Sequence, residues 1–219
     1  MGNYLLSEGI QEVAMESTGC YWVQVWDILL ELVFTLHLVN PFLIKQMLGR
    51  KRDVKDAQWI ACLLNKGLIR DSVVPSPTIQ ELRTYCRKYT KLQQQKTRSL
   101  QKMDKIMIMG GIRISSCMIN LGTKSVMNIV TALIAGESDP MRLVKLVYGN
   151  TANKQSGKLR EALTGNMRDH FRIQLQWEKD EYDLFERQTE DCLIRMERIC
   201  DAHYIEEIAL LRGCLNFFF

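Results

Sequence analysis

The N-terminal third of the chain alternates between strand-like and helix-like patterns of apolar residues. The short run QEVAM at positions 11–15 leads into Glu16 and then Ser-Thr-Gly, which predicts a strand followed by a turn. Positions 20–31 place tryptophan, valine and leucine three and four residues apart, as in a helix with one buried face. The nearly continuous run VFTLHLV at 33–39 predicts a buried strand, which Asn40-Pro41 ends. Strand, helix and strand in this order favour a right-handed parallel unit and the α/β class.

Two long helical patterns dominate the rest of the chain. Pro75 and Pro77 mark a short linker, and an apolar stripe then continues in alternating three- and four-residue steps until Gly110-Gly111. Its positions are Ile79, Leu82, Cys86, Tyr89, Leu100, Met103 and Met107, with Gln93 and Lys96 as polar interruptions. A second stripe of similar spacing runs from Phe171 to Ile199. The two patterns predict a long helical, coiled-coil-like region after the α/β part.

Charge separates these two helices, although the whole chain has a formal net charge of only +4. Positions 83–105 carry eight basic residues against one acid, whereas positions 160–207 carry seven basic residues against thirteen acids. Two interpretations remain open. The basic helix binds nucleic acid, with Arg87 and Lys91 among the candidate contacts, or it pairs with the acidic helix in an antiparallel hairpin or a dimer. Both can hold, because a helix–helix seam uses only part of each helix.

The cysteines and the apolar runs indicate a reducing, cytoplasmic setting without membrane insertion. The seven cysteines form no CxxC pair, and the N-terminus does not have the pattern of a signal peptide. The most apolar run, positions 28–44, contains Glu31, His37 and the Asn40-Pro41 break, and it is shorter than the roughly 20 apolar residues of a membrane span. We therefore interpret it as buried secondary structure.

The stretch GRKRDVKDAQWIA, at positions 49–61, carries the most distinctive chemistry. If it opens a helix, Asp53 and Asp56 project from the same face. Their mutual repulsion is relieved if both point to water or if a divalent cation such as Mg²⁺ or Mn²⁺ lies between them. Acidic residues are also common in a first helical turn, where they meet the positive end of the helix dipole. Because ligands of parallel sheets gather beyond the carboxyl ends of the strands, Glu16 joins this candidate metal site.

Basic residues surround the candidate site: Lys45, Arg50, Lys51, Arg52 and Lys55. They would suit a nucleic acid lying across a metal site, or they serve only to balance the neighbouring acids.

Four segments in one order resemble the DEDD transposases of bacterial insertion sequences, in the family numbered one-ten, which includes the pilin gene-inverting recombinases. These segments are AMESTG, LVNP, GRKRDVKDAQWIACLL and VPSPTIQELR. The resemblance extends from about Glu12 to Leu211 and is most specific in the first hundred residues. It implies a catalytic domain of RNase H-like (RuvC-like) fold with four acids around divalent metal, then a helical hairpin and a second domain. Glu16 matches the second acid, Asp53 the third and Asp56 the fourth.

Two departures from the family pattern concern the ends of the sequence. The first acid has no match among the fifteen residues before Glu16, and after Leu211 the chain reads RGCLNFFF. The family's C-terminal domain, which carries a serine proposed as the DNA nucleophile, is expected there instead. We therefore expect a partial catalytic domain at 1–74, a helical region at 75–211 and an aberrant tail at 212–219, from a frameshift or premature stop.

The resemblance makes a transposase for DNA transposition and recombination the leading interpretation. It implies DNA, a structured guide RNA and other copies of the chain as partners, and we expect the chain to be inactive by itself. One alternative is a non-catalytic helical module that oligomerises, binds nucleic acid and associates with the full-length transposase. Another is a self-sufficient nuclease that uses Glu16, Asp53 and Asp56.

Overall fold

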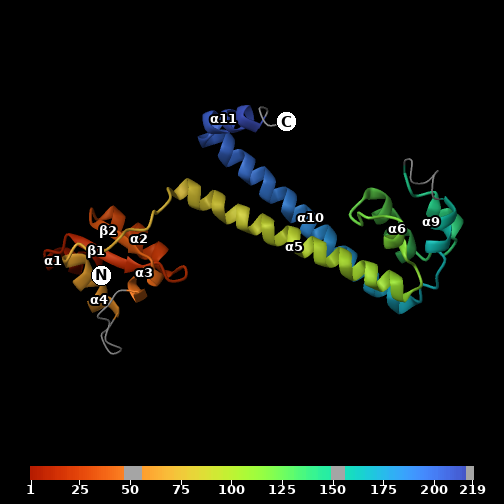
Figure 1. Ribbon diagram of the computed structural model, residues 1–219, viewed down its shortest axis with the longest axis horizontal. Coiled ribbons are helices and arrows are strands. Elements are labelled where there is room, and N and C mark those ends of the chain that lie inside the picture. The colour runs from red at the N-terminus through yellow and green to blue at the C-terminus, as the bar shows by residue number, and fades with distance from the viewer. Residues whose placement is uncertain (47–55, 149–155, 216–219) are drawn as a thin grey trace. The chain divides into compact units, whose positions relative to one another are not determined.

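The computed structural model describes residues 1–46, 56–148 and 156–215 (Figure 1). The chain forms two compact units, Met1–Ser76 and Pro77–Phe219. Within the described residues, none of the helices combines the length and the apolar character that crossing a membrane requires.

The first unit is built on a pair of parallel strands. Its elements are α1 (Gly2–Ser7), β1 (Glu12–Glu16), α2 (Tyr21–Glu31), β2 (Thr35–Val39), α3 (Pro41–Gln46) and α4 (Asp56–Asn65). Glu12 pairs with Thr35 and Glu16 pairs with Val39, which confirms the predicted parallel strand–helix–strand unit. The described residues form a sheet of these two strands. An α/β unit is therefore shown, whereas the RNase H-like fold stays a prediction.

The connections around β2 differ in detail from the predicted run of seven residues. Val33 has φ of 64° and Thr35 is the first strand residue, so the chain makes a left-handed turn between α2 and β2 before it extends. Asn40 ends the strand as predicted, and it also begins α3. The Phe42 backbone N–H donates to the Asn40 Oδ1 at 2.9 Å, and Pro41 occupies the first helical position, where its missing N–H costs nothing.

A small core joins the sheet to its helices. Val39 on β2, Ile44 on α3, and Ile60 and Leu63 on α4 are buried together. Ala14 of β1, Trp59 and Ile69 pack against them. Because α4 shares this core with both strands, the helix that begins at Asp56 is held against β1, the strand that ends at Glu16.

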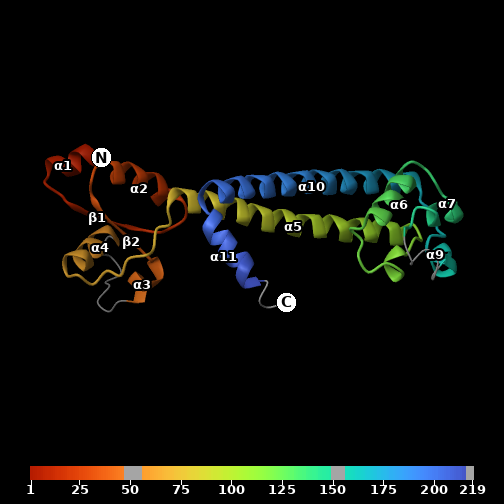
Figure 2. The same cartoon turned by 90° about the horizontal axis from the view of Figure 1, so that it is seen from above.

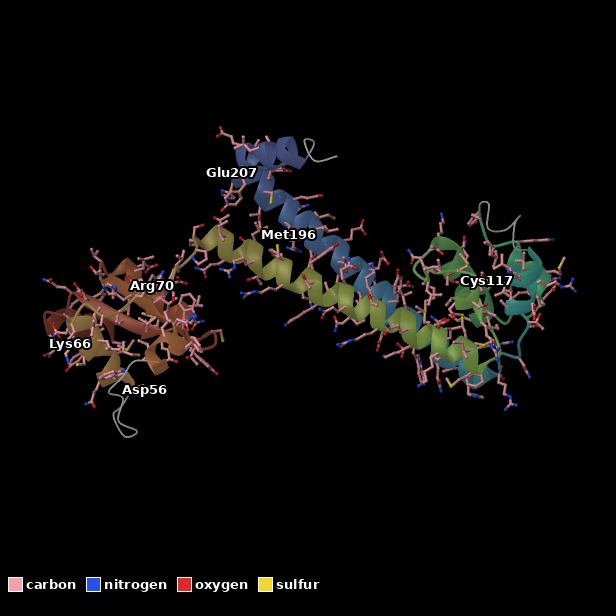
Figure 3. The ribbon with its side chains drawn as sticks, in the orientation of Figure 1. Asp56, Lys66, Arg70, Cys117, Met196 and Glu207 are labelled. Atoms are coloured by element: carbon pink, nitrogen blue, oxygen red, sulfur yellow. The ribbon has the colours of Figure 1, made fainter. Side chains whose placement is uncertain are left out.

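The second unit is organised around two long helices. Its α-helices are α5 (Pro77–Met109), α6 (Lys124–Ile134), α7 (Pro140–Val144), α9 (Ser156–Ala162), α10 (Asp169–His203) and α11 (Ile205–Leu215). Figures 1 and 2 show α5 and α10 side by side over much of their length. Cys86 Sγ lies 3.4 Å from Met196 Sδ, and Lys102 Nζ lies 3.1 Å from Glu178 (Figure 3 labels Met196). Residue numbers therefore rise on one helix as they fall on the other, so the helices form an antiparallel hairpin.

The buried face of α5 differs from the predicted apolar stripe. Leu92, Ser99, Met103, Ile106 and Met107 are buried, and Cys86 is exposed. The predicted stripe consisted mainly of apolar residues, so it omitted Ser99, which is buried in the seam. Coiled-coil packing of the two helices stays a prediction.

Short helices cover the end of the hairpin where α5 stops. Their core includes Ile114, Ile129, Leu133, Leu143 and Leu159, all with an exposed fraction of 0%. Two side-chain caps begin α6 and α7: Thr123 Oγ1 accepts from the Val126 N–H, and Asp139 Oδ1 accepts from the Met141 N–H.

Candidate catalytic and nucleic-acid-binding sites

Glu16 occupies the strand end that the sequence predicts. It is the last residue of β1 and is partly buried. The next backbone N–H, of Ser17, donates to the Val39 carbonyl at 3.0 Å and so continues the ladder for one more bond. The Thr18 hydroxyl donates to the Glu16 Oε1, which restricts the orientation of the carboxylate. Glu16 is therefore a positioned carboxylate at the carboxyl end of a parallel strand.

Asp56 is the first residue of α4 and is exposed (Figure 3). In a first helical turn a carboxylate meets the positive end of the helix dipole, so this position has a structural explanation as well as a chemical one. Five other predicted site residues, Arg50, Lys51, Arg52, Asp53 and Lys55, lie outside the described residues. Lys45 is part of α3, but its side chain also lies outside the described part.

The donor chemistry of Glu16 and Asp56 fits a hard divalent cation, which takes carboxylate oxygens as ligands. Two carboxylates are few for such a site. Among the described residues, no group of three or more histidine, cysteine, aspartate or glutamate side chains is arranged to hold a metal ion. A site with three carboxylates would need Asp53, so the predicted metal site depends on a residue beyond the described part.

A contact that the sequence did not indicate joins β2 to the segment before α5. His37 Nδ1 lies 3.0 and 3.1 Å from the two carboxylate oxygens of Asp71, and its Nε2 lies 3.9 Å from Glu12 Oε2. The Ser72 N–H also donates to the Leu38 carbonyl at 2.7 Å. The arrangement fastens residues 71–72 along β2. No local motif could have revealed it, because His37 and Asp71 are 34 residues apart.

The hairpin seam contains a polar layer. Lys96 Nζ lies 3.0 Å from Glu186 Oε1 and 5.5 Å from the centre of the Tyr182 ring. Burial, and then the neighbouring Glu186, raise the pKa of the Tyr182 hydroxyl. Partial burial works against ionisation of Glu186, but hydrogen bonds from Tyr182 and Lys96 outweigh it and lower the pKa of that carboxyl. Farther along, hydrogen bonding to Glu178 raises the pKa of Lys102.

Six of the eight basic residues at positions 83–105 do not contribute to this pairing. Arg83, Arg87, Lys88, Lys91, Arg98 and Lys105 are exposed and make no ion pair within 4 Å inside the described part of the chain. Tyr85, Tyr89 and Met103 mark the side of α5 that faces α10: Tyr85 hydrogen-bonds to Arg195 of α10, Tyr89 is half-buried and Met103 is buried. Arg87, Lys91 and Lys105 each lie two residues farther along α5, and two residues turn a helix by roughly 200°. They therefore project away from α10. Lys96 and Lys102 pair with α10, as one interpretation predicts, whereas nucleic-acid binding by the exposed basic residues stays a prediction.

Residues 4–108 match a family model described as Transposase. The model is that of the DEDD transposases of the IS110 insertion sequences. This segment belongs to the DEDD transposase family. No curated protein and no solved structure matches the chain.

The transposase segment spans all of the first unit and nearly all of α5. It includes the matched acids Glu16, Asp53 and Asp56, and also Arg87 and Lys91. The match confirms the family that the four sequence segments indicate. The roles of individual residues stay predictions, and the acidic helix α10 lies beyond the matched residues.

Proposed function

We propose that this DEDD transposase-family chain acts in DNA transposition and recombination for an insertion sequence, in the cytoplasm. The transposase match over residues 4–108 carries the proposal. The parallel unit of the first domain supports it, because Glu16 stands at a strand end and α4, which begins at Asp56, packs against that strand.

The carboxylates of Glu16, Asp53 and Asp56 are the proposed ligands of Mg²⁺ or Mn²⁺. A divalent ion would stabilise charge on the reacting phosphate and activate a hydroxyl nucleophile. The protein's own contribution is orientation. The hydrogen bond from Thr18 fixes one oxygen of Glu16, and the start of α4 directs Asp56 from a rigid element.

Two groups of basic residues are the proposed nucleic-acid contacts. Lys45, Arg50, Lys51, Arg52 and Lys55 lie next to the acids in the sequence, and Arg87 and Lys91 lie on the outward face of α5. Exposed cations in a row bind the phosphate backbone of either DNA or a structured guide RNA, because backbone contacts are independent of base sequence.

The outward face of α5 provides a direct test of binding. We expect the double variant Arg87→Glu with Lys91→Glu to weaken binding to duplex DNA and to lower the salt slope of log K by about two, one for each lost phosphate contact. Lys66→Glu with Arg70→Glu makes the same charge change on exposed residues of the first unit (Figure 3). Equal losses from both double variants would show a general charge effect and would refute binding by this face.

The acids are tested separately from binding. We propose that the matched acids Glu16, Asp53 and Asp56 are needed for strand cutting of element-end DNA, assayed with Mg²⁺ and a guide RNA. Asp53→Asn should abolish cutting and leave binding unchanged, because the substitution removes a metal ligand and leaves the basic residues in place. Cutting that survives this substitution would refute the role of Asp53.

A second candidate function is a non-catalytic module that self-associates through the helical region and binds nucleic acid or the full-length transposase. The observation that favours it is that α5, within the helical hairpin, carries an exposed basic face. Binding without cutting, together with co-purification with an intact transposase, would support this candidate. A chain that cuts DNA would exclude it.

A further inference from the structure

A polar cavity lies between α9 and the segment that follows α5. Its volume is about 600 Å³, which is within the range of roughly 300–1,000 Å³ typical of small-molecule sites. Among the described residues, no aromatic or large apolar side chain lines it. Its reactive and polar lining consists of Arg113, Ser116, Cys117, Lys158, Glu161 and Thr164 (Figure 3 labels Cys117). All of them lie beyond the matched residues 4–108, so the proposed function gives this cavity no role.

Backbone contacts hold the two walls of the cavity together. The Arg113 N–H of one wall donates to the Ala162 carbonyl of the other at 2.8 Å. Gly111 has φ of 86°, and a Cβ at this position would lie only 3.2 Å from the Gly165 Cα. Leu159 is fully buried and anchors α9 in the core of the second unit. The cavity is therefore framed by segments that are packed in place.

Each wall contributes one cation to the cavity. Arg113 comes from the segment after α5, and Lys158 comes from α9. Both side chains are exposed, and neither makes an ion pair within 4 Å inside the described part of the chain. Guanidinium and ammonium groups offer only hydrogen-bond donors, and a guanidinium can hold two oxygens of a phosphate at once. The pair therefore favours an anion that carries more than one charge.

The remaining polar groups of the lining are acceptors. The Ser116 hydroxyl donates to the Arg113 carbonyl at 2.7 Å, and the Thr164 hydroxyl donates to the Arg160 carbonyl at 2.8 Å. Each hydroxyl proton is used in this way, so the oxygen is left to accept. Glu161 adds a carboxylate, which also accepts and is exposed. A ligand that satisfies these groups has hydroxyl donors in addition to its negative charge.

We propose that this cavity binds a phosphomonoester that carries hydroxyl groups, as a sugar phosphate does. A phosphomonoester has a charge of about −1.5 to −2 at pH 7, which suits the two cations Arg113 and Lys158. The ligand's hydroxyl groups donate to Glu161, Ser116 and Thr164. Two sources share this chemistry: a free sugar phosphate, and the phosphorylated ribose at the 5′ end of an RNA strand. The site differs from the outward face of α5, which is proposed to contact the phosphates within a strand.

Calorimetric titration of the full chain with ribose 5-phosphate tests the proposal. Arg113→Gln and Lys158→Gln should each weaken binding at least about tenfold, because each removes hydrogen bonds to a charged group. Glu161→Gln should weaken binding of ribose 5-phosphate but not of inorganic phosphate, which has no sugar hydroxyl groups. Lys124→Gln is a matched control, since Lys124 is an exposed cation of the same unit on α6, outside the cavity.

Cys117 reports where the ligand binds. Its thiol lines the cavity and is half-buried, so a bound ligand should slow its alkylation by iodoacetamide. Cys62, an exposed thiol of the first unit, is the internal control and should react at the same rate with and without ribose 5-phosphate. Ribose alone should protect neither thiol, because it lacks the phosphate that the cations hold.

Two short RNAs of one sequence distinguish the two sources. The internal phosphates are the same in both, so a preference for the RNA with a 5′-phosphate over the one with a 5′-hydroxyl, lost in Arg113→Gln, assigns the cavity to strand ends. Binding of ribose 5-phosphate without that preference assigns it to a free sugar phosphate.

Three results would overturn the proposal. They are no binding of either ligand, inorganic phosphate bound as tightly as ribose 5-phosphate, and an equal loss of binding in Lys124→Gln. Circular dichroism of every variant separates a lost site from a lost fold. Failure here would leave the proposed function standing, because the binding test on Arg87 and Lys91 concerns a different surface.

Discussion

Replacing Gly165 with alanine should destabilise the second unit through a backbone clash. A Cβ at position 165 would lie 2.5 Å from the Gly110 carbonyl oxygen, 2.8 Å from Ile112 Cγ1 and 2.9 Å from the Gly111 carbonyl carbon. Two of these three atoms are backbone, so the strain cannot be relieved by a change of rotamer. The segment after α9 has to move away from the end of α5.

The cost follows from what that movement breaks. The Asn166 N–H donates to the Gly110 carbonyl at 2.7 Å, and the Arg113 N–H donates to the Ala162 carbonyl at 2.8 Å. Overpacking costs about 1–3 kcal/mol, and loss of one such hydrogen bond costs about 1 kcal/mol. We therefore expect Gly165→Ala to lower the free energy of unfolding by about 2–4 kcal/mol. Stabilities of single domains are only about 5–15 kcal/mol, so this is a large fraction.

Urea unfolding followed by far-ultraviolet circular dichroism measures the change. Gly157→Ala is a matched control: its Cβ meets no described atom within 4 Å, and it lies in α9. Alanine at position 157 should raise the free energy of unfolding by up to about 1 kcal/mol, because alanine forms helices more readily than glycine. The reasoning is refuted if Gly165→Ala costs less than Gly157→Ala, or if the two variants change stability in the same direction.

Two further predictions concern the turn before β2 and the polar layer of the hairpin. Val33 is 92% exposed with φ of 64°, so Val33→Gly removes left-handed strain without losing packing and should stabilise by about 0.5–1 kcal/mol, measured as a higher urea midpoint. The lowered pKa of Glu186 gives stability that is present at neutral pH, above the ordinary glutamate pKa, and is lost as pH falls through the folded-state pKa. Glu186→Gln should therefore lower the urea midpoint of unfolding near pH 7 and reduce the fall of that midpoint as the pH is lowered. If the midpoint of the variant falls with acid pH as steeply as that of the wild type, the hydrogen bonds from Lys96 and Tyr182 do not have this role.

The sequence alone determined the local elements and the family. Alternating and helical periodicities are properties of short windows, so they located β1, α2, β2 and both long helices to within a few residues. The Asn40-Pro41 pair ends β2 because proline cannot donate to the ladder, and the same pair begins α3. Glu16 could be assigned to a strand end from a similarly local signal, because the apolar run stops there and the flexible Ser-Thr-Gly turn follows.

Only the tertiary structure decided which side chains meet. The antiparallel register of α5 and α10 brings Lys96 and Lys102 next to acids of α10 and leaves Arg87 and Lys91 on the outward face. All four are basic residues of one helix, so the sequence alone does not distinguish them. His37 with Asp71, and Gly165 with Gly110, are contacts across 34 and 55 positions. Such contacts depend on the sum of many weak interactions between distant segments, which local periodicity does not record. The same reason applies to α10, where packing buries Leu175 and Tyr182 and leaves Trp177 and Leu184 exposed.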